Sequence, residues 1–247
     1  MRLKASTTRP AKAFIMYSII IPAYDEADRI KNVLMSYATE FSGQEIIVVF
    51  DGQDNTPGTI EDVMKDCPYI RLLTFHKRLG KGGAIIEGFK AARGNKIGFT
   101  DADESVSPKD LKGMFETLGE VDGIIASRQL ATSKIMIKQP FRRRLASKGF
   151  NLLVRTLFGL PFKDTQCGAK VFMRRAICDI IDELETRGFE IDVEILWRLR
   201  NKGYRVAEYP ISWSHSEGSK FNLSDSCAMF TSLIKIRFQK VKLRRQR

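Results

Sequence analysis

Two carboxylates separated by one small residue carry the clearest chemistry in this sequence. Asp101 and Asp103 flank Ala102 directly after an apolar run, so both side chains are expected in one loop. Carboxylate oxygens of this kind hold Mg²⁺ or Mn²⁺, which bridge the phosphates of a bound nucleotide. A solvated turn before a helix would also explain them, although Ser107 already suits that helix cap. We therefore expect a metal site at Asp101 and Asp103.

A run of glycines, Gly80-Lys81-Gly82-Gly83, opens a predicted helix. Glycines at a helix N-terminus allow a phosphate to approach free backbone N–H groups closely. The run resembles a dinucleotide-binding fingerprint only superficially, because it follows the third predicted strand and lacks the full G-x-G-x-x-G spacing. The sequence therefore favours phosphate binding over a Rossmann oxidoreductase.

Other polar residues also follow predicted strands. Asp51 ends the second strand and can accept hydrogen bonds from a base or ribose, although an Asp-Gly pair is also a common turn. Arg128 follows the fifth strand, and the cationic run 142–144 opens an apolar helix. Such arginines are usually solvated charges. Their place beside an apolar helix favours a role with a lipid phosphate.

The elements that must position these residues alternate between strand and helix. Runs rich in Ile and Val predict strands, and the stretches between them have the apolar spacing of amphipathic helices. The predicted strands are 18–22, 45–50, 70–75, 96–100 and 122–126. This rhythm predicts an α/β fold with a mostly parallel sheet flanked by helices. Ligands bind outside the carboxyl ends of such strands, so the polar loops are expected to form one site.

The second half of the chain predicts further helices and one more strand. A helix is expected at about 192–201 and a strand at 206–213. The final stretch places five apolar residues on one helical face, with basic residues elsewhere: Phe230, Leu233, Ile234, Phe238 and Val241. We divide the chain into a flexible basic extension (1–15), a catalytic domain (16–222) and a basic amphipathic C-terminal helix (223–247).

Composition narrows the class of protein. A chain of 247 residues with 43% hydrophobic residues can bury a core, and its net charge of +12 indicates an anionic partner: nucleic acid, an anionic lipid surface or a phosphorylated substrate. Four cysteines without a C-x-x-C pair argue against a zinc site or a disulfide framework and indicate a cytoplasmic setting. No apolar run reaches the roughly 18 residues that cross a bilayer.

Taken in order, these motifs resemble the series of family 2 glycosyltransferases with the GT-A fold. More narrowly, they resemble the group of dolichyl-phosphate glucosyltransferases and dolichol-phosphate mannose synthases. The resemblance spans about Tyr17 to Lys220 and is carried by residues 18–26, 45–52, 80–83, 101–103, 127–128, 164–168 and 218–220. The segments at 164–168 and 217–220 are more similar to the glucosyltransferase branch.

The resemblance implies roles for single residues. It implies a nucleotide-sugar site at Pro22, Ala23, Tyr24, Glu26, Asp51, Lys81, Gly82, Asp101, Ala102, Asp103 and Lys220. It implies an acceptor-phosphate site at Arg128, Arg143 and Ser147, and a metal, Mg²⁺ or Mn²⁺, at Asp101 and Asp103. Catalytic roles fall on Asp101, Asp103, Arg128 and Lys220. Two departures leave UDP and GDP both open: Asp25 stands for the usual Asn, and Phe50 for the first acid of Asp-Asp-Gly-Ser.

The expected activity is inverting transfer of a sugar to dolichyl or polyprenyl phosphate for glycan or glycoprotein synthesis, with UDP-glucose as the leading donor. A phosphate monoester, whose second pKa is about 6, is a nucleophile that needs no strong general base. GDP-mannose and UDP-N-acetylglucosamine are alternative donors. A basic nucleic-acid-binding protein is the alternative from another class, but clustered acids would repel its ligand, so no nucleic acid is expected. The basic C-terminal helix is expected to attach the protein peripherally to the anionic cytoplasmic face of a membrane.

Overall fold

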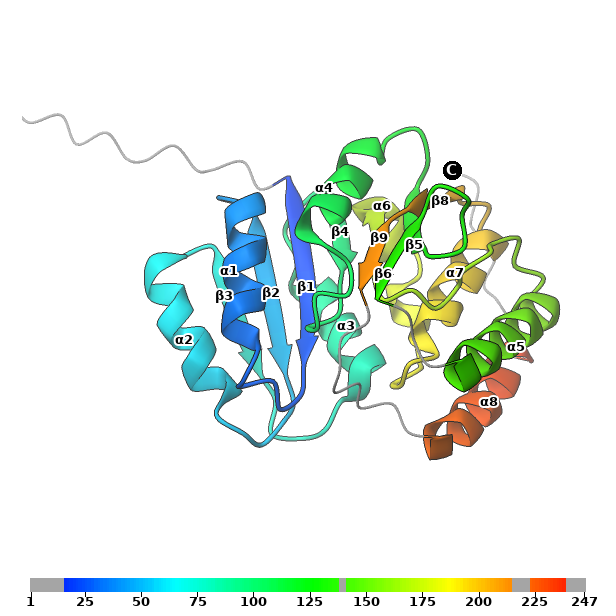
Figure 1. Ribbon diagram of the computed structural model, residues 1–247, viewed down its shortest axis with the longest axis horizontal. Helices are drawn as coiled ribbons and strands as arrows, with labels where there is room; N and C mark the ends of the chain where they lie inside the picture. Colours follow the sequence, from blue (N-terminus) through cyan, green and yellow to red (C-terminus); the bar gives the residue numbers. More distant parts are fainter. Residues whose placement is uncertain (1–15, 138–140, 215–222, 239–247) are drawn as a thin grey trace, which may run out of the picture.

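The computed structural model describes residues 16–137, 141–214 and 223–238 (Figure 1). Its centre is a seven-stranded sheet in the order β3-β2-β1-β4-β7-β5-β8. These strands are β1 (Tyr17–Ala23), β2 (Glu45–Phe50), β3 (Ile70–Thr74), β4 (Lys96–Phe99), β5 (Gly123–Ser127), β7 (Lys170–Met173) and β8 (Val206–Pro210). All run in one direction except β7, which is antiparallel to both of its neighbours. A small parallel sheet joins β6 (Lys134–Ile137) to β9 (Ser212–Ser214).

Consecutive isoleucines in β1 divide the core into two layers. Ile19 and Ile21 pack beneath α1 (Ile30–Glu40), α2 (Thr56–Asp66) and α4 (Pro108–Thr117). Ile20 points to the other face, beneath α3 (Gly80–Ala91), α6 (Arg174–Cys178) and α7 (Ile191–Asn201), which follows the 3₁₀ helix η1 (Ile181–Glu183). Successive side chains of a strand point to opposite faces, so a strand that is apolar throughout needs helices on both.

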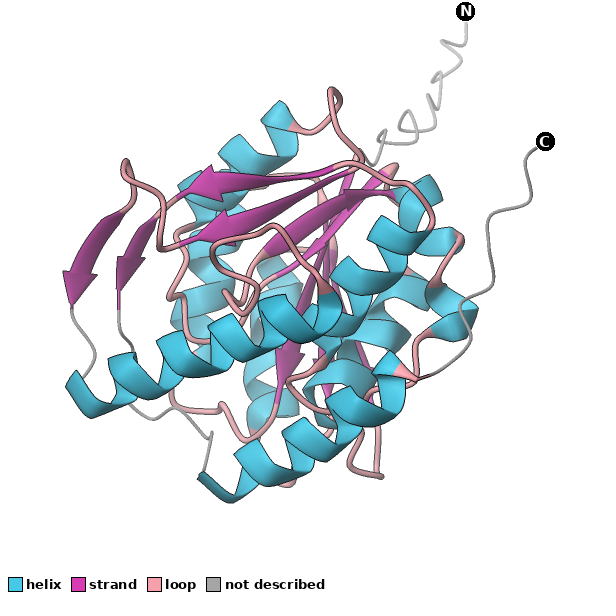
Figure 2. Ribbon diagram, turned by 90° about the vertical axis from the view of Figure 1, so that its right-hand side faces the viewer, coloured by secondary structure: helices cyan, strands magenta, loops and turns pink. Residues whose placement is uncertain are grey.

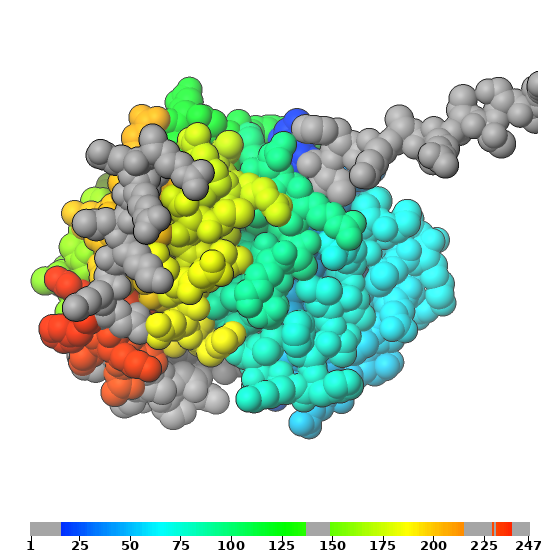
Figure 3. All heavy atoms as spheres, turned by 180° about the vertical axis from the view of Figure 1, so that it is seen from behind, coloured from blue at the N-terminus to red at the C-terminus, as the bar shows by residue number. Residues whose placement is uncertain are grey.

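A third apolar cluster joins the two long helices of the second half, α5 (Phe141–Phe158) and α8 (Leu223–Arg237), which lie side by side (Figures 1 and 2). Val154 of α5 and Leu233 of α8 are both buried in this cluster. The Arg237 side chain also donates to the Leu157 carbonyl at 2.9 Å. Seen from behind, α8 lies against the segment that contains α7 (Figure 3). Within the described ranges, no helix has both the length and the apolar character that a membrane span requires.

The α/β fold and its mostly parallel sheet confirm the prediction, and two local differences have physical causes. Strand β7 was not predicted because it begins with Lys170, a charged residue that is wholly buried and ion-paired with Asp192. The predicted strand 206–213 is interrupted at Ile211, where the chain leaves β8 for the small sheet. Both differences depend on tertiary contacts that a local pattern does not contain.

The buried face of α8 differs from the predicted one. Met229, Leu233 and Ile236 are buried, whereas Ile234 is 37% exposed and Phe238 is 82% exposed. The helix packs through the i, i+4, i+7 stripe that faces α5 and α7, and this leaves part of the predicted apolar face exposed. The extension 1–15 and the basic residues from 239 onward lie outside the described residues.

Candidate functional site

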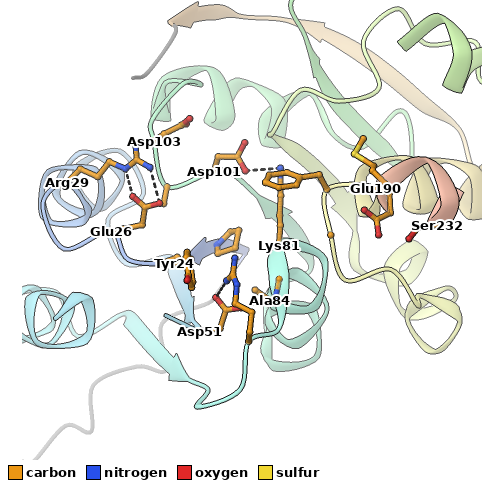
Figure 4. A pocket seen from close by; sticks show the side chains of 18 residues that line it. Tyr24, Glu26, Arg29, Asp51, Lys81, Ala84, Asp101, Asp103, Glu190 and Ser232 are labelled. Atoms are coloured by element: carbon orange, nitrogen blue, oxygen red, sulfur yellow. Dashed lines mark hydrogen bonds and ion pairs between the residues drawn. The ribbon is translucent and has the colours of Figure 1, made fainter. Parts of the chain in front are cut away.

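A pocket of about 520 Å³ opens at the carboxyl edge of the sheet (Figure 4). Loops after β1, β2, β3 and β4 contribute to it, as do the loop before α7 and the helix α8. Most residues predicted for the nucleotide-sugar line this pocket: Pro22, Ala23, Tyr24, Glu26, Asp51, Lys81, Asp101, Ala102 and Asp103. The parallel strands therefore bring together loops that are far apart in sequence, as expected.

Lys81 and Asp101 meet in the middle of the pocket. The Lys81 ammonium lies 2.8 Å from Asp101 Oδ1 and 3.3 Å from Asp192 Oδ2. Asp192 is also ion-paired with the buried Lys170, so two acids and two lysines alternate from the pocket into the core. Burial raises the pKa of Asp101, although Lys81 opposes the shift. Burial lowers the pKa of Lys81, but the two carboxylates outweigh it and raise that pKa overall.

The two acids of the Asp101-Ala102-Asp103 motif fit a metal that is shared with a substrate. Asp103 Oδ1 accepts hydrogen bonds from the amide and hydroxyl of Ser105, at 3.0 and 2.7 Å, which orients its carboxylate. No cluster of three or more His, Cys, Asp or Glu suited to a metal occurs in the described part of the chain. Mg²⁺ commonly binds through one or two carboxylates plus substrate phosphates. The pair suits that arrangement and not a closed cage of protein ligands.

Gly168 has no side chain, and this leaves room for the Asp101 carboxylate. A Cβ atom at this position would overlap the Asp101 carboxylate, so a side chain here would displace the acid. The neighbouring Cys167 is fully buried, and burial raises its pKa to about 12. Its thiol therefore stays protonated at neutral pH. The segment 164–168 thus lies beside the Asp101 carboxylate, which lines the pocket.

Asp51 holds the loop that leads into α3. Its Oδ2 accepts hydrogen bonds from the amides of Leu79 and Gly80, at 2.7 and 2.8 Å, and its other oxygen pairs with Arg78. The Arg78 guanidinium lies 3.5 Å from the centre of the Tyr24 ring, at the pocket wall. Arg78 was not among the predicted site residues, because a charge in a polar loop gives no signal of its partners.

Asp25 explains why an acid can replace the usual amide at this position. Its φ of 51° is in the left-handed region, which Asn and Asp tolerate better than most residues. Its Oδ1 accepts hydrogen bonds from the amides of Gln53 and Asp54, at 2.7 and 3.2 Å. An Asn side chain has an oxygen that can accept in the same way. The other departure, Phe50, is buried in the core.

The glycines in the first turn of α3 contact another loop of the protein. The amide of Gly82 donates to the Arg187 carbonyl at 2.9 Å, and that of Gly83 donates to the same oxygen at 3.4 Å. A Cβ atom on Gly82 would lie 2.5 Å from the Thr186 carbonyl oxygen. These glycines therefore leave room for the loop 185–190 to pack against α3. Gly82 does not line the pocket. The partner lies about 100 residues away, so the local pattern could not identify it.

Arg128 is held by a buried acid. Asp164 accepts from its amide, Nε and Nη2 at 3.0, 2.7 and 2.9 Å. Asp164 is buried, which raises its pKa, but Arg128 outweighs this and keeps the pKa below its usual range. Arg128 does not line the pocket. Arg143 and Ser147 lie in α5, whose side chains up to residue 148 are outside what the structure describes. Lys220 also lies outside the described residues. The roles of all three residues stay predictions.

The remaining pocket wall contains residues that were not predicted. Gly188, Phe189 and Glu190 precede α7, and Met229 and Ser232 belong to α8. Arg29 also lines the pocket and pairs with Glu26, with Nη2 2.9 Å from Oε1. The position of residues 188–190 directly before a predicted helix was an available signal. The α8 residues gave none, because only tertiary packing brings that helix to the pocket.

Comparisons with known proteins identify the family of this chain. The model of the family described as "Glycosyl transferase family 2" matches residues 18–181. A dolichyl-phosphate beta-glucosyltransferase from Saccharomyces cerevisiae is 34% identical over 90% of this chain and 74% of its own length. The protein of that name from Dictyostelium discoideum is 31% identical over 91% and 75%. The glycosyltransferase AglD of Haloferax volcanii is 33% identical over 87% of this chain and 36% of its own length.

Solved structures share the fold. Glucosyl-3-phosphoglycerate synthase from Mycobacterium tuberculosis, crystallised with Mn²⁺, UDP-glucose and phosphoglyceric acid, has a TM-score of 0.65 to this chain. The alignment covers 91% of this chain and 79% of that one, at 17% sequence identity. At this identity the likeness concerns the arrangement of the sheet and helices.

Proposed function

The chain belongs to glycosyl transferase family 2, and on this premise we propose that it transfers glucose from UDP-glucose to dolichyl or another polyprenyl phosphate. The observation that carries the proposal is the meeting of Asp101, Asp103 and Lys81 in one pocket at the carboxyl edge of the sheet. The names of the relatives from yeast and Dictyostelium support glucose and dolichyl phosphate over other pairs of substrates.

In the proposed reaction, an oxygen of the acceptor phosphate attacks the anomeric carbon of glucose. The bond from that carbon to the UDP oxygen breaks, UDP leaves with the bonding electrons, and the anomeric configuration inverts. The nucleophile is anionic at neutral pH, so the protein has to orient it and needs no strong base. Lys81 supplies positive charge at the point where the leaving diphosphate becomes more negative.

A divalent metal, Mg²⁺ or Mn²⁺, held by Asp101 and Asp103 together with the donor phosphates, would neutralise charge on the leaving group. The Mn²⁺ in the mycobacterial synthase of similar fold is in keeping with this assignment. Lys81 pairs with Asp101, so its ammonium lies beside a proposed metal ligand and in the pocket that would hold the diphosphate.

A lipid acceptor requires the protein to reach a membrane surface, and α5 and α8 offer a means. Leu152 and Leu153 of α5 are 63% and 45% exposed, and Phe238 at the end of α8 is 82% exposed. Exposed apolar side chains on a chain with a net charge of +12 suit an anionic bilayer, to which each basic residue adds about 1 kcal/mol. We propose peripheral attachment on the cytoplasmic face, which the free buried thiols of Cys67 and Cys167 also favour.

A panel of radiolabelled nucleotide-sugars tests the proposed function. UDP-glucose, UDP-N-acetylglucosamine and GDP-mannose are each incubated with the full chain, Mn²⁺ and dolichyl phosphate in detergent. We expect label from UDP-glucose to appear in the lipid extract, with at most about one-hundredth as much from the other two, a discrimination of about 3 kcal/mol. Transfer from GDP-mannose alone would contradict the choice of glucose. Transfer to free sugars at the same rate would contradict the lipid acceptor.

A further inference from the structure

One wall of the pocket contains neither the proposed metal ligands nor Lys81. It is formed by the loop before α7 and by the middle of α8, and its lining residues are Gly188, Phe189, Glu190, Met229 and Ser232. Glu190 is the acid in this wall, and only 7% of its surface is exposed. A carboxylate at the edge of a pocket for an anionic ligand needs an explanation, because it repels the phosphates.

The order of residues along the pocket shows which part of the ligand this wall meets (Figure 4). Tyr24 and Asp51 lie on one side, Asp101 and Lys81 lie between, and Glu190 lies on the other side. A nucleotide-sugar with its base near Asp51 and its diphosphate near Asp101 directs its sugar toward Glu190. The sugar is the uncharged, hydroxyl-rich end of the ligand, so a carboxylate there is an acceptor for its hydroxyl groups.

Protein groups lie on two sides of the Glu190 carboxylate. It folds back over Gly188, where a Cβ atom would lie 3.1 Å from the carboxyl carbon. The amides of Glu190 and Gly188 and the Ser232 hydroxyl favour the charged form of the Glu190 carboxyl, but burial has the larger effect and raises its pKa.

The loop that carries Glu190 is fixed independently of α8. The Thr186 amide and hydroxyl donate to the buried Glu194 carboxylate, at 2.9 and 2.7 Å. The amide of Gly82 holds the next residue, Arg187, through its carbonyl. The Glu190 carbonyl accepts the first hydrogen bonds of α7. Held at both ends, the loop presents a preorganised side chain, as a specificity site requires.

We propose that Glu190 determines sugar specificity by accepting a hydrogen bond from a ring hydroxyl of the donor sugar, and that Ser232 positions its carboxylate. This inference rests on the proposed function. A site built around one hydroxyl rejects an analogue that lacks it, because the buried acceptor is then left without a partner. The hydroxyl that donates to Glu190 is the one whose removal lowers kcat/KM of the wild-type chain most.

The test compares UDP-glucose with its 2-, 3-, 4- and 6-deoxy analogues in the wild-type chain, Glu190→Ala, Glu190→Gln and Ser232→Ala. In the wild type, we expect kcat/KM to fall about 100-fold for one analogue. In Glu190→Ala, kcat/KM for UDP-glucose should fall by a similar factor, while that for the sensitive analogue changes less than threefold. Glu190→Gln keeps an oxygen acceptor and should recover part of the loss, and Ser232→Ala should lose about tenfold.

Calorimetric titration with UDP and Mn²⁺ separates this inference from the proposed function. UDP lacks the sugar, so its affinity should be the same in all four proteins within twofold, which also shows that the variants are folded. A uniform loss for all five sugar donors in Glu190→Ala and Glu190→Gln, with UDP affinity unchanged, would overturn the specificity role. Equal turnover of every deoxy analogue by the wild type would overturn it too. Failure of the wild type to bind UDP would instead refute the proposed function, and this inference with it.

Discussion

At the scale of the residue, Asp103 provides the first test of the metal site. In Asp103→Asn, transfer with Mn²⁺ should fall by a factor of about 100 or more, because a metal contributes several kcal/mol to stabilising the leaving group. Initial rates across a range of Mn²⁺ concentrations, before and after treatment with EDTA, measure the effect. The matched control is Asp66→Asn, which removes an exposed acid at the end of α2. Turnover close to that of this control would contradict the metal assignment.

Gly168 offers a second test that changes no charge. In Gly168→Ala, the added methyl group would overlap the Asp101 carboxylate and displace it, so kcat should fall by at least about tenfold, as expected when a reacting group is misplaced. Gly119→Ala is the control, because a Cβ atom there meets no atom within 4 Å. Steady-state kinetics and circular dichroism on both variants separate misplacement from unfolding. Equal kcat values for the two would show that Asp101 does not need its present position.

The sequence alone located the chemistry of this site better than its supporting contacts. Asp101 and Lys81 were predicted because residues that directly follow parallel strands share one edge of the sheet. Gly82 was assigned to a phosphate, but its partner is the Arg187 carbonyl. Glu190 was missed although it directly precedes a predicted helix, because that position does not show that its loop reaches the pocket. A pattern of residue types shows which groups can react, whereas the partner of each group depends on packing across the chain.

At the scale of the element, the Arg128–Asp164 pair connects the end of β5 to the loop before β7. Asp164→Asn should lower the free energy of unfolding by about 3 kcal/mol at pH 7, because it removes one partner of a buried pair. The folded-state pKa of Asp164 is depressed, so its contribution is present above the pKa of the unfolded state, about 3.9, and is lost as the pH falls through the lower value.

Urea unfolding at pH 7, 5 and 3 measures this contribution. The difference between wild type and Asp164→Asn should be constant between pH 7 and 5 and should shrink at pH 3. Asp66→Asn, an exposed control, should stay within about 0.5 kcal/mol of the wild type at pH 7. A difference that does not change with pH would show that the carboxylate charge is not what Arg128 requires.

The elements themselves were predicted unevenly. Strands β1 and β2 are apolar at nearly every position, and the helices beside them have a clear apolar face, so their local patterns were sufficient. Strand β7 is short and starts with a buried lysine, and its place between β4 and β5 depends on a hydrogen-bond register that sequence patterns do not report. The predicted face of α8 was wrong in part because the orientation of α8 depends on α5 and α7.

At the scale of the whole molecule, attachment to a membrane should depend on exposed apolar residues as well as on charge. The double variant Leu152→Ser with Leu153→Ser should bind vesicles containing phosphatidylserine at least about tenfold more weakly, because each leucine loses part of the 1.5–3 kcal/mol gained by full burial. Co-sedimentation measures the partition coefficient. Raising the salt concentration should weaken binding of both proteins.

A short-chain, water-soluble polyprenyl phosphate provides the control for this experiment. Transfer to this acceptor should be the same in the wild type and in the double variant, because neither leucine lines the pocket. Unchanged vesicle binding by the double variant would show that α5 is not part of the membrane-facing surface. The basic residues beyond 238 would then be the next to test.

Because α8 supplies part of the pocket wall, a chain that is being translated can form its sheet before it can become active. The last strand of the main sheet ends at Pro210, whereas Met229 and Ser232 are synthesised about 20 residues later. When Pro210 leaves the ribosomal tunnel, these wall residues are still inside it. A nascent chain can therefore assemble its sheet and the Asp101–Lys81 pair before it can enclose a sugar.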